Sequence, residues 1–104
     1  MKTKTVNVAI QVLPFTDPSK TYSMVDKAIE VIEKSGLKYR VTPFETVIEG
    51  EYSQVMEVVM EAQEACYEAG AESLLCNLKI QSHSISEVSI EDKTGKYDEK
   101  QSQN

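Results

Sequence analysis

The chain has 104 residues, of which 40% are apolar, and a formal net charge of −6. A chain of this length forms one domain with a single core, and we expect that domain over residues 1–95, followed by a disordered polar tail over residues 96–104. The acidic balance argues against nucleic acid and anionic membranes as main partners.

The N-terminal third is predicted to form a strand and an amphipathic helix. The apolar residues that alternate with polar or small ones, as in a half-buried strand, are Val6, Val8, Ile10 and Val12. Two prolines and an aspartate over residues 13–19 break pairing and predict a loop. Ser19 or Thr21 can cap the following helix, and Gly36 ends it. The apolar stripe of this helix consists of Val25, Ala28, Ile29 and Ile32.

The rest of the chain is predicted to form a hairpin, a second helix and a last strand. Residues 37–42 and 44–50 are the two strands of the hairpin, with Pro43 in their tight connection. The second helix begins at Ser53 and stops at Gly70. Its inner stripe consists of Val55, Val58, Val59, Ala62, Cys66 and Ala69. The alternating apolar residues of the last strand are Leu74, Cys76, Leu78 and Ile80.

The predicted order is strand–helix–strand–strand–helix–strand, which is the ferredoxin-like βαββαβ arrangement of the α+β class. Each helix has one apolar stripe, so both are expected on one face of a four-stranded antiparallel sheet. By parity the other face carries Ala9, Gln11, Arg40, Val47, Glu49, Leu75, Asn77 and Lys79. A second subunit packed on this mixed face would explain its composition. Scattered apolar residues on a solvated face are the alternative.

The stretch Glu45-Thr46-Val47-Ile48-Glu49-Gly50-Glu51 holds three carboxylates and a hydroxyl within seven residues. Strand interiors are usually depleted in Glu and Gly. Such acceptors suit a ligand that donates hydrogen bonds or bears positive charge, although a charged strand end that leads into a helix would have the same composition. Thr46 and Glu49 face opposite sides of a regular strand. Either a bulge near Gly50 turns Glu49, or only one of the two lines a pocket.

Five segments are similar to those of one known family. These segments are Val8-Ala9-Ile10-Gln11-Val12-Leu13-Pro14, Gly36-Leu37-Lys38-Tyr39, residues 43–51, Val55-Met56 and Leu78-Lys79-Ile80. In these segments the chain resembles the thiamine-binding protein family, whose members are related to bacterial domains that bind thiamine and its hydroxymethylpyrimidine half. The Thr-x-x-Glu-Gly-Glu core is fairly specific to it. Many relatives continue the last strand as Lys-Ile-Asp-x-Arg, and the acid and the arginine of that motif are missing in this chain.

The resemblance implies a ferredoxin-like fold, dimers that pair into tetramers, and binding of a thiamine-like ligand without catalysis. A carboxylate can accept a hydrogen bond from the amino group of an aminopyrimidine. The predicted ligand-binding residues are Thr46, Glu49, Glu51, Gln11, Asn77 and Lys79. The alternative function is an oligomeric regulatory or interaction module that uses the open sheet face, with a different small ligand or none.

Catalytic, metal and redox roles find little support in the sequence. The one histidine, His83, lies beyond the last core strand, and no glycine-rich phosphate loop is present. The spacing of the three carboxylates fits no cation-binding loop. We therefore expect no catalytic residue, no metal and no cofactor. Cys66 and Cys76 have no Cys-x-x-Cys spacing, and no segment resembles a signal peptide or a membrane span, so a cytoplasmic protein with reduced thiols is expected.

Overall fold

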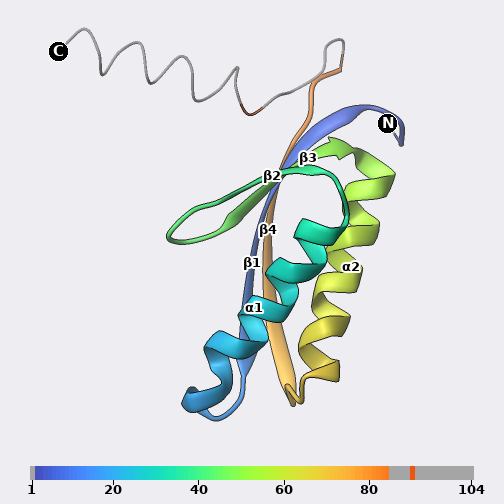
Figure 1. Ribbon diagram of the computed structural model, residues 1–104. Coiled ribbons are helices and arrows are strands. Elements are labelled where there is room, and N and C mark those ends of the chain that lie inside the picture. Colours follow the sequence, from blue (N-terminus) through green and yellow to red (C-terminus); the bar gives the residue numbers. More distant parts are fainter. Residues whose placement is uncertain (1, 85–89, 91–104) are drawn as a thin grey trace, which may run out of the picture.

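The computed structural model describes residues 2–84 and residue 90. These residues form a four-stranded antiparallel sheet with two helices on one face (Figure 1). The elements in chain order are β1 (Thr5–Phe15), α1 (Pro18–Lys34), β2 (Lys38–Val41), β3 (Thr46–Glu51), α2 (Tyr52–Glu68) and β4 (Ser73–Gln81). The predicted ferredoxin-like fold is confirmed. The tail predicted over residues 96–104 and the domain limit at residue 95 lie outside the described residues and stay predictions.

The strand order is β2-β3-β1-β4, and every neighbouring pair is antiparallel. β1 is a central strand, on which Val8 lies opposite Ile48 of β3 and Ile80 of β4. Val6, Val8 and Ile10 are buried against the helices. Because side chains alternate across a strand, the residues between them face the side of the sheet opposite α1 and α2.

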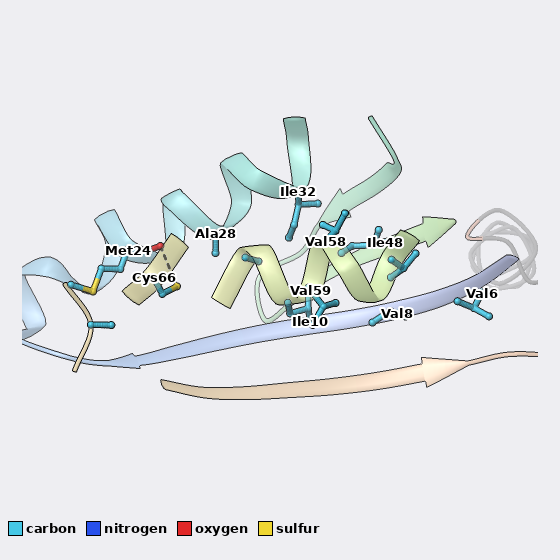
Figure 2. Close-up of a cluster of buried hydrophobic side chains, with 13 residues drawn as sticks. Val6, Val8, Ile10, Met24, Ala28, Ile32, Ile48, Val58, Val59 and Cys66 are labelled. Carbon is cyan, nitrogen blue, oxygen red and sulfur yellow. Dashed lines mark hydrogen bonds between the residues drawn. The ribbon is translucent and has the colours of Figure 1, made fainter. Parts of the chain in front are cut away.

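The hydrophobic core fills the space between the helices and the sheet, as the labelled side chains of Figure 2 show. Its members are Val6, Val8, Ile10, Met24, Ala28, Ile32, Ile48, Val55, Val58, Val59, Ala62, Cys66 and Ala71. The thiol of Cys66 donates a weak hydrogen bond of 3.7 Å to the carbonyl oxygen of Met24, which joins α2 to α1. Complete burial of an aliphatic side chain of this size stabilises the fold by about 1.5–3 kcal/mol, so this layer dominates stability.

β1 is longer than the sequence predicts. The prolines predict that pairing ends near Leu13, yet β1 continues to Phe15, and Pro14 lies opposite Leu74. Beyond Ile10, β1 pairs only with β4, because the pairing with β3 ends there. Proline lacks an N–H group, and it fits a strand where one side has no partner that needs this donor.

Both helix starts also differ from the prediction by one or two residues. The N-cap of α1 is Asp17, and its carboxylate accepts from the backbone N–H and from the hydroxyl of Ser19, each at 3.1 Å. Pro18 fills the first helical position, where a missing N–H costs nothing. α2 begins at Tyr52 directly after β3, with no loop between them. The predicted helix ends are confirmed, since Gly36 and Gly70 follow the two helices with φ of +78° and +107°.

Candidate functional site on the open sheet face

The open face of the sheet consists of rows of side chains, of which two cross all four strands and two join β1 to β4. The register places Lys38, Glu49, Asn7 and Gln81 in one row. The next row contains Arg40, Val47, Ala9 and Lys79. Gln11 and Asn77 lie opposite one another in a third row, and Leu13 and Leu75 in a fourth. The face predicted from parity is therefore assembled as expected.

A cavity of about 370 Å³ covers the second row. Its lining residues are Asn7, Ala9, Arg40, Thr42, Glu45, Val47, Lys79, Ile80, Gln81 and Ile90. Two short side chains, Ala9 and Val47, lie between two long ones, Arg40 and Lys79, so the middle of the row is low and its ends are high. The volume falls within the range of small-molecule sites, about 300–1,000 Å³. The cavity has an apolar floor and polar walls.

One wall carries a carboxylate that the hairpin holds in place. Glu45 follows β2 and precedes β3, and its side chain is 26% exposed. Its backbone N–H donates to the hydroxyl oxygen of Thr42 at 3.1 Å, and its carbonyl oxygen accepts from the N–H of Thr42 at 2.9 Å. The ammonium of Lys79 lies 3.4 Å from its carboxylate. An acceptor whose backbone is fixed in this way loses little freedom when it binds a donor.

A second hollow, of about 490 Å³, lies beside the cavity and shares Glu45 and Lys79 with it. The other residues that line it are Gln11, Phe44, Asn77 and Leu78. The side-chain amide of Asn77 donates to Gln11 Oε1 at 3.2 Å. Three predicted site residues, Gln11, Asn77 and Lys79, are thus brought together on one face.

Glu49 lies on the same face but does not line the cavity. Its carboxylate is 14% exposed, and its two oxygens are engaged by different groups. Oε1 accepts a hydrogen bond of 2.8 Å from the backbone N–H of Ile90, and Oε2 lies 3.8 Å from the ammonium of Lys38. Ile90 and Asn7, both nearly fully buried, lie beside Glu49 and line the cavity themselves.

Thr46 and Glu49 lie on opposite faces of the sheet. The register between β1 and β3 is continuous from Thr5–Glu51 to Ile10–Thr46, so no bulge turns Glu49. Thr46 is 6% exposed and lines a small hollow of about 120 Å³ between α1 and the β2–β3 connection. The two residues therefore do not share a pocket. Glu51 occupies the N-cap position of α2 without a side-chain capping bond.

Of the ten residues that line the cavity, only Lys79 was a predicted site residue; Asn7, Arg40 and Ile90 are among the nine that were not. Arg40 did have a signal, because parity placed it on the open face. Asn7 had the same signal as the next alternating position of β1. Ile90 had none, because it lies nine residues beyond the end of β4. The sequence indicated Glu45 as one of three carboxylate acceptors, but it gave no indication for Thr42, the hydrogen-bond partner of Glu45.

The described residues contain no group of three or more His, Cys, Asp and Glu side chains placed to hold a metal ion. Neither α1 nor α2 is long and apolar enough to span a membrane. The two thiols, Cys66 and Cys76, lie on the helix side of the sheet, and burial raises the pKa of each. Both are free cysteines.

Comparison with known proteins connects this chain to a family. The sequence profile described as thiamine-binding protein matches residues 8–98. The UPF0045 protein CPE1503 of Clostridium perfringens is 41% identical over 93 residues, which are 89% of this chain and 97% of the relative. A Bacillus cereus structure, described as a domain of unknown function, is 40% identical, with a TM-score of 0.86 and coverage of 90% of both chains.

A third relative has a functional description of its own. It is a Thermotoga maritima protein, TM0486, described provisionally as a thiamine biosynthesis/salvage protein. It is 32% identical, with a TM-score of 0.81, and the match covers 89% of this chain and 98% of that one. Because the family profile and these relatives span nearly the whole chain, the protein belongs to the thiamine-binding protein family.

Proposed function

We propose that this protein binds a thiamine-like small molecule, thiamine or its hydroxymethylpyrimidine half, in the cavity on the open sheet face. The observation that carries the proposal is a 370 Å³ cavity with an apolar floor and a fixed carboxylate, Glu45, in its wall. Family membership supports this class of ligand. The role is binding rather than conversion, so a bound ligand is released unchanged.

The chemistry of the cavity suits a flat heteroaromatic ring. Ala9 and Val47 offer an apolar surface on which a pyrimidine ring can lie. Glu45 then accepts a hydrogen bond from the exocyclic amino group, and such a charge-assisted bond contributes about 1.5–3 kcal/mol. Of the predicted site residues, Lys79 lines this cavity, and Gln11 and Asn77 line the adjoining hollow.

The other predicted residues take different roles in this proposal. Glu49 acts at the border of the cavity, where it holds Ile90 and Lys38 in place. Thr46 contributes from the opposite face through the position of β3, and Glu51 through the junction of β3 and α2. Glu45 replaces Glu49 as the carboxylate proposed to touch the ring.

Titration calorimetry with thiamine and with hydroxymethylpyrimidine tests the proposal. Glu45→Gln keeps the shape and removes the charge, so affinity is expected to fall tenfold to a hundredfold. Glu64→Gln, an exposed carboxylate on α2, is the matched control and leaves affinity unchanged. If neither compound produces heat at millimolar concentration, the proposed function is wrong. Mass spectrometry of the recovered ligand should find it unchanged, and a converted product would contradict the binding role.

We also propose that a second copy of the chain covers the open face, in a dimer that pairs into a tetramer. Leu13 and Leu75 lie opposite one another there and are 40% and 48% exposed. Burial of such a pair favours association. This feature also favours the alternative function, an oligomeric regulatory or interaction module with a different small ligand or none. The cytoplasm is the proposed location, since a reducing compartment keeps Cys66 and Cys76 as thiols.

A further inference from the structure

The charge of the open-face cavity differs in sign from the charge of the chain. The chain carries a net charge of −6, yet the charged residues that line the cavity are two cations, Arg40 and Lys79, and one carboxylate, Glu45. Lys38 and Glu49, in the neighbouring row, form a pair with no net charge. A cavity with an excess of positive charge is a poor match for the thiazolium cation of thiamine alone.

The two cations are not equivalent. Lys79 is already paired with Glu45 at 3.4 Å. Arg40 makes no ion pair and no side-chain hydrogen bond within the part of the chain that the structure describes. It is also the only arginine among the 11 basic residues of the sequence. An arginine that lines a cavity and lacks a carboxylate partner has its whole fork of donors available to a ligand.

The geometry of the row allows a ligand to contact both walls. Arg40 and Lys79 are separated by two strands, hence by about 14 Å between backbones at a strand spacing of about 4.8 Å. Long side chains from both ends can approach a molecule that lies over Ala9 and Val47. A ligand with an aromatic ring and an anionic group at one end fits this arrangement, with the ring near Glu45 and the anion near Arg40.

We propose that Arg40 binds a phosphomonoester, so that the preferred ligand of the cavity is a phosphate ester of the aminopyrimidine compound and not the free alcohol. This inference rests on the proposed function, because it assigns the second end of the same ligand. A guanidinium matches a phosphate with two parallel charge-assisted hydrogen bonds, a geometry that an ammonium does not offer. The phosphate also supplies the negative charge that the cavity lacks.

Calorimetry with five compounds tests this assignment, namely thiamine, thiamine monophosphate, hydroxymethylpyrimidine, its phosphate ester and inorganic phosphate. The wild-type protein is expected to bind at least one phosphate ester at least tenfold more tightly than the matching alcohol. The two esters identify which ring system the cavity takes. Inorganic phosphate alone is expected to bind at least a hundredfold more weakly than the better ester, because it lacks the ring.

Three variants locate the effect. Arg40→Gln is expected to reduce the preference for the ester to less than threefold, because affinity for the ester should fall much more than affinity for the alcohol. Arg40→Lys keeps the charge without the fork and should retain an intermediate preference. Lys20→Gln, which removes an equal charge from an exposed position at the start of α1, should leave the preference unchanged. Thermal unfolding should show that each variant keeps the fold, because Arg40 is exposed on the edge strand β2 and Lys20 is exposed on α1.

The outcomes separate the two proposals. If the alcohols bind and the esters bind no more tightly, the phosphate assignment is wrong and the proposed function stands. If the esters are preferred and Arg40→Gln keeps that preference, Arg40 is not the phosphate contact and the inference is overturned. If no compound binds, the proposed function fails and the inference fails with it.

Discussion

The backbone N–H of Ile90 donates a hydrogen bond of 2.8 Å to Oε1 of Glu49, 41 positions earlier in the chain. This bond fixes Ile90, which is 4% exposed, at the border of the cavity that it lines. The opposite oxygen of Glu49 faces Lys38. Glu49 therefore has a role in the architecture of the open face that requires no contact with a ligand.

The Glu49–Ile90 bond leads to a prediction about local stability. Glu49→Ala removes the acceptor, and the amide of Ile90 should then exchange with solvent at least tenfold faster in a hydrogen-exchange NMR experiment. Glu49→Gln keeps an acceptor oxygen and should preserve most of the protection. Glu51→Ala serves as the control, because Glu51 makes no side-chain capping bond. Equal exchange rates in the wild type and in Glu49→Ala would show that this bond does not hold Ile90.

Close packing around Gly50 explains why β3 has a glycine at this position. A Cβ built at this position would lie 3.2 Å from Leu37 Cδ2 and 3.2 Å from Val55 Cγ2. These two side chains would have to shift by a few tenths of an ångström to admit a methyl group, so we expect Gly50→Ala to lower the free energy of unfolding by about 1–3 kcal/mol. Urea unfolding measures this change.

Ala71→Gly is a useful comparison for Gly50→Ala. Ala71 is 8% exposed at the edge of the core, and removal of its methyl group should cost about 1 kcal/mol through lost burial and increased chain entropy. A methyl group is thus expected to destabilise at one position and to stabilise at the other. If Gly50→Ala proves neutral or stabilising, the close approach at β3 is not a constraint on the fold.

Much of this fold could be predicted from the sequence because periodicity records burial. The alternation around Val8 and the stripe of α2 as far as Cys66 identified the core face correctly. The last predicted member of that stripe, Ala69, is exposed, because it is the C-cap residue at the end of α2. The predictions failed where pairing decides the outcome: Pro14 is tolerated because only one neighbour pairs with that part of β1. Edge strand β2 also alternates in sequence, yet Tyr39 and Val41 are 36% and 52% exposed, because an edge strand has less of the sheet around it.

The cavity was harder to predict than the core. Its two ends, Arg40 and Lys79, come from the two outer strands and meet only through the register of all four. Alternation along the strands assigned both residues to the open face, but it could not predict a cavity between them. Ile90 could not have been placed from the sequence, since its position depends on long-range contacts such as its hydrogen bond to Glu49. Only the continuous register between β1 and β3 shows that Thr46 and Glu49 lie on opposite faces of the sheet.

The two thiols lead to a prediction about pH and reactivity. Burial raises the pKa of Cys66 and of Cys76, and for Cys66 the nearby Cys76 adds to the shift. The folded state therefore favours the neutral thiols, which stabilises the fold at pH values below the ordinary thiol pKa, 9.0. Above that pH the unfolded chain loses its thiol protons first, so the free energy of unfolding should fall as pH rises.

Alkylation and urea unfolding measure these effects. At pH 8 iodoacetamide should modify neither thiol within the time in which a denatured sample reacts completely, because the thiolate is the reactive form. The fall in the free energy of unfolding between pH 8 and pH 10 should be smaller in Cys66→Ala than in the wild type. Rapid alkylation of Cys66 in the folded protein would contradict its burial.

Leu75 leads to a prediction about assembly. It lies opposite Leu13 on the open face and is 48% exposed. If a second copy of the chain covers this face, Leu75→Lys places a charge in a desolvated interface and should weaken association at least tenfold. Met60→Lys is the matched control, since Met60 is 51% exposed on α2, which packs on the opposite face of the sheet.

Sedimentation velocity at micromolar concentration should show an oligomer for the wild type and for Met60→Lys, and smaller species for Leu75→Lys. A wild type that sediments as an 11.7 kDa monomer would rule out association through this face. An oligomer that persists in Leu75→Lys and dissociates in Met60→Lys would instead place the interface on the helices.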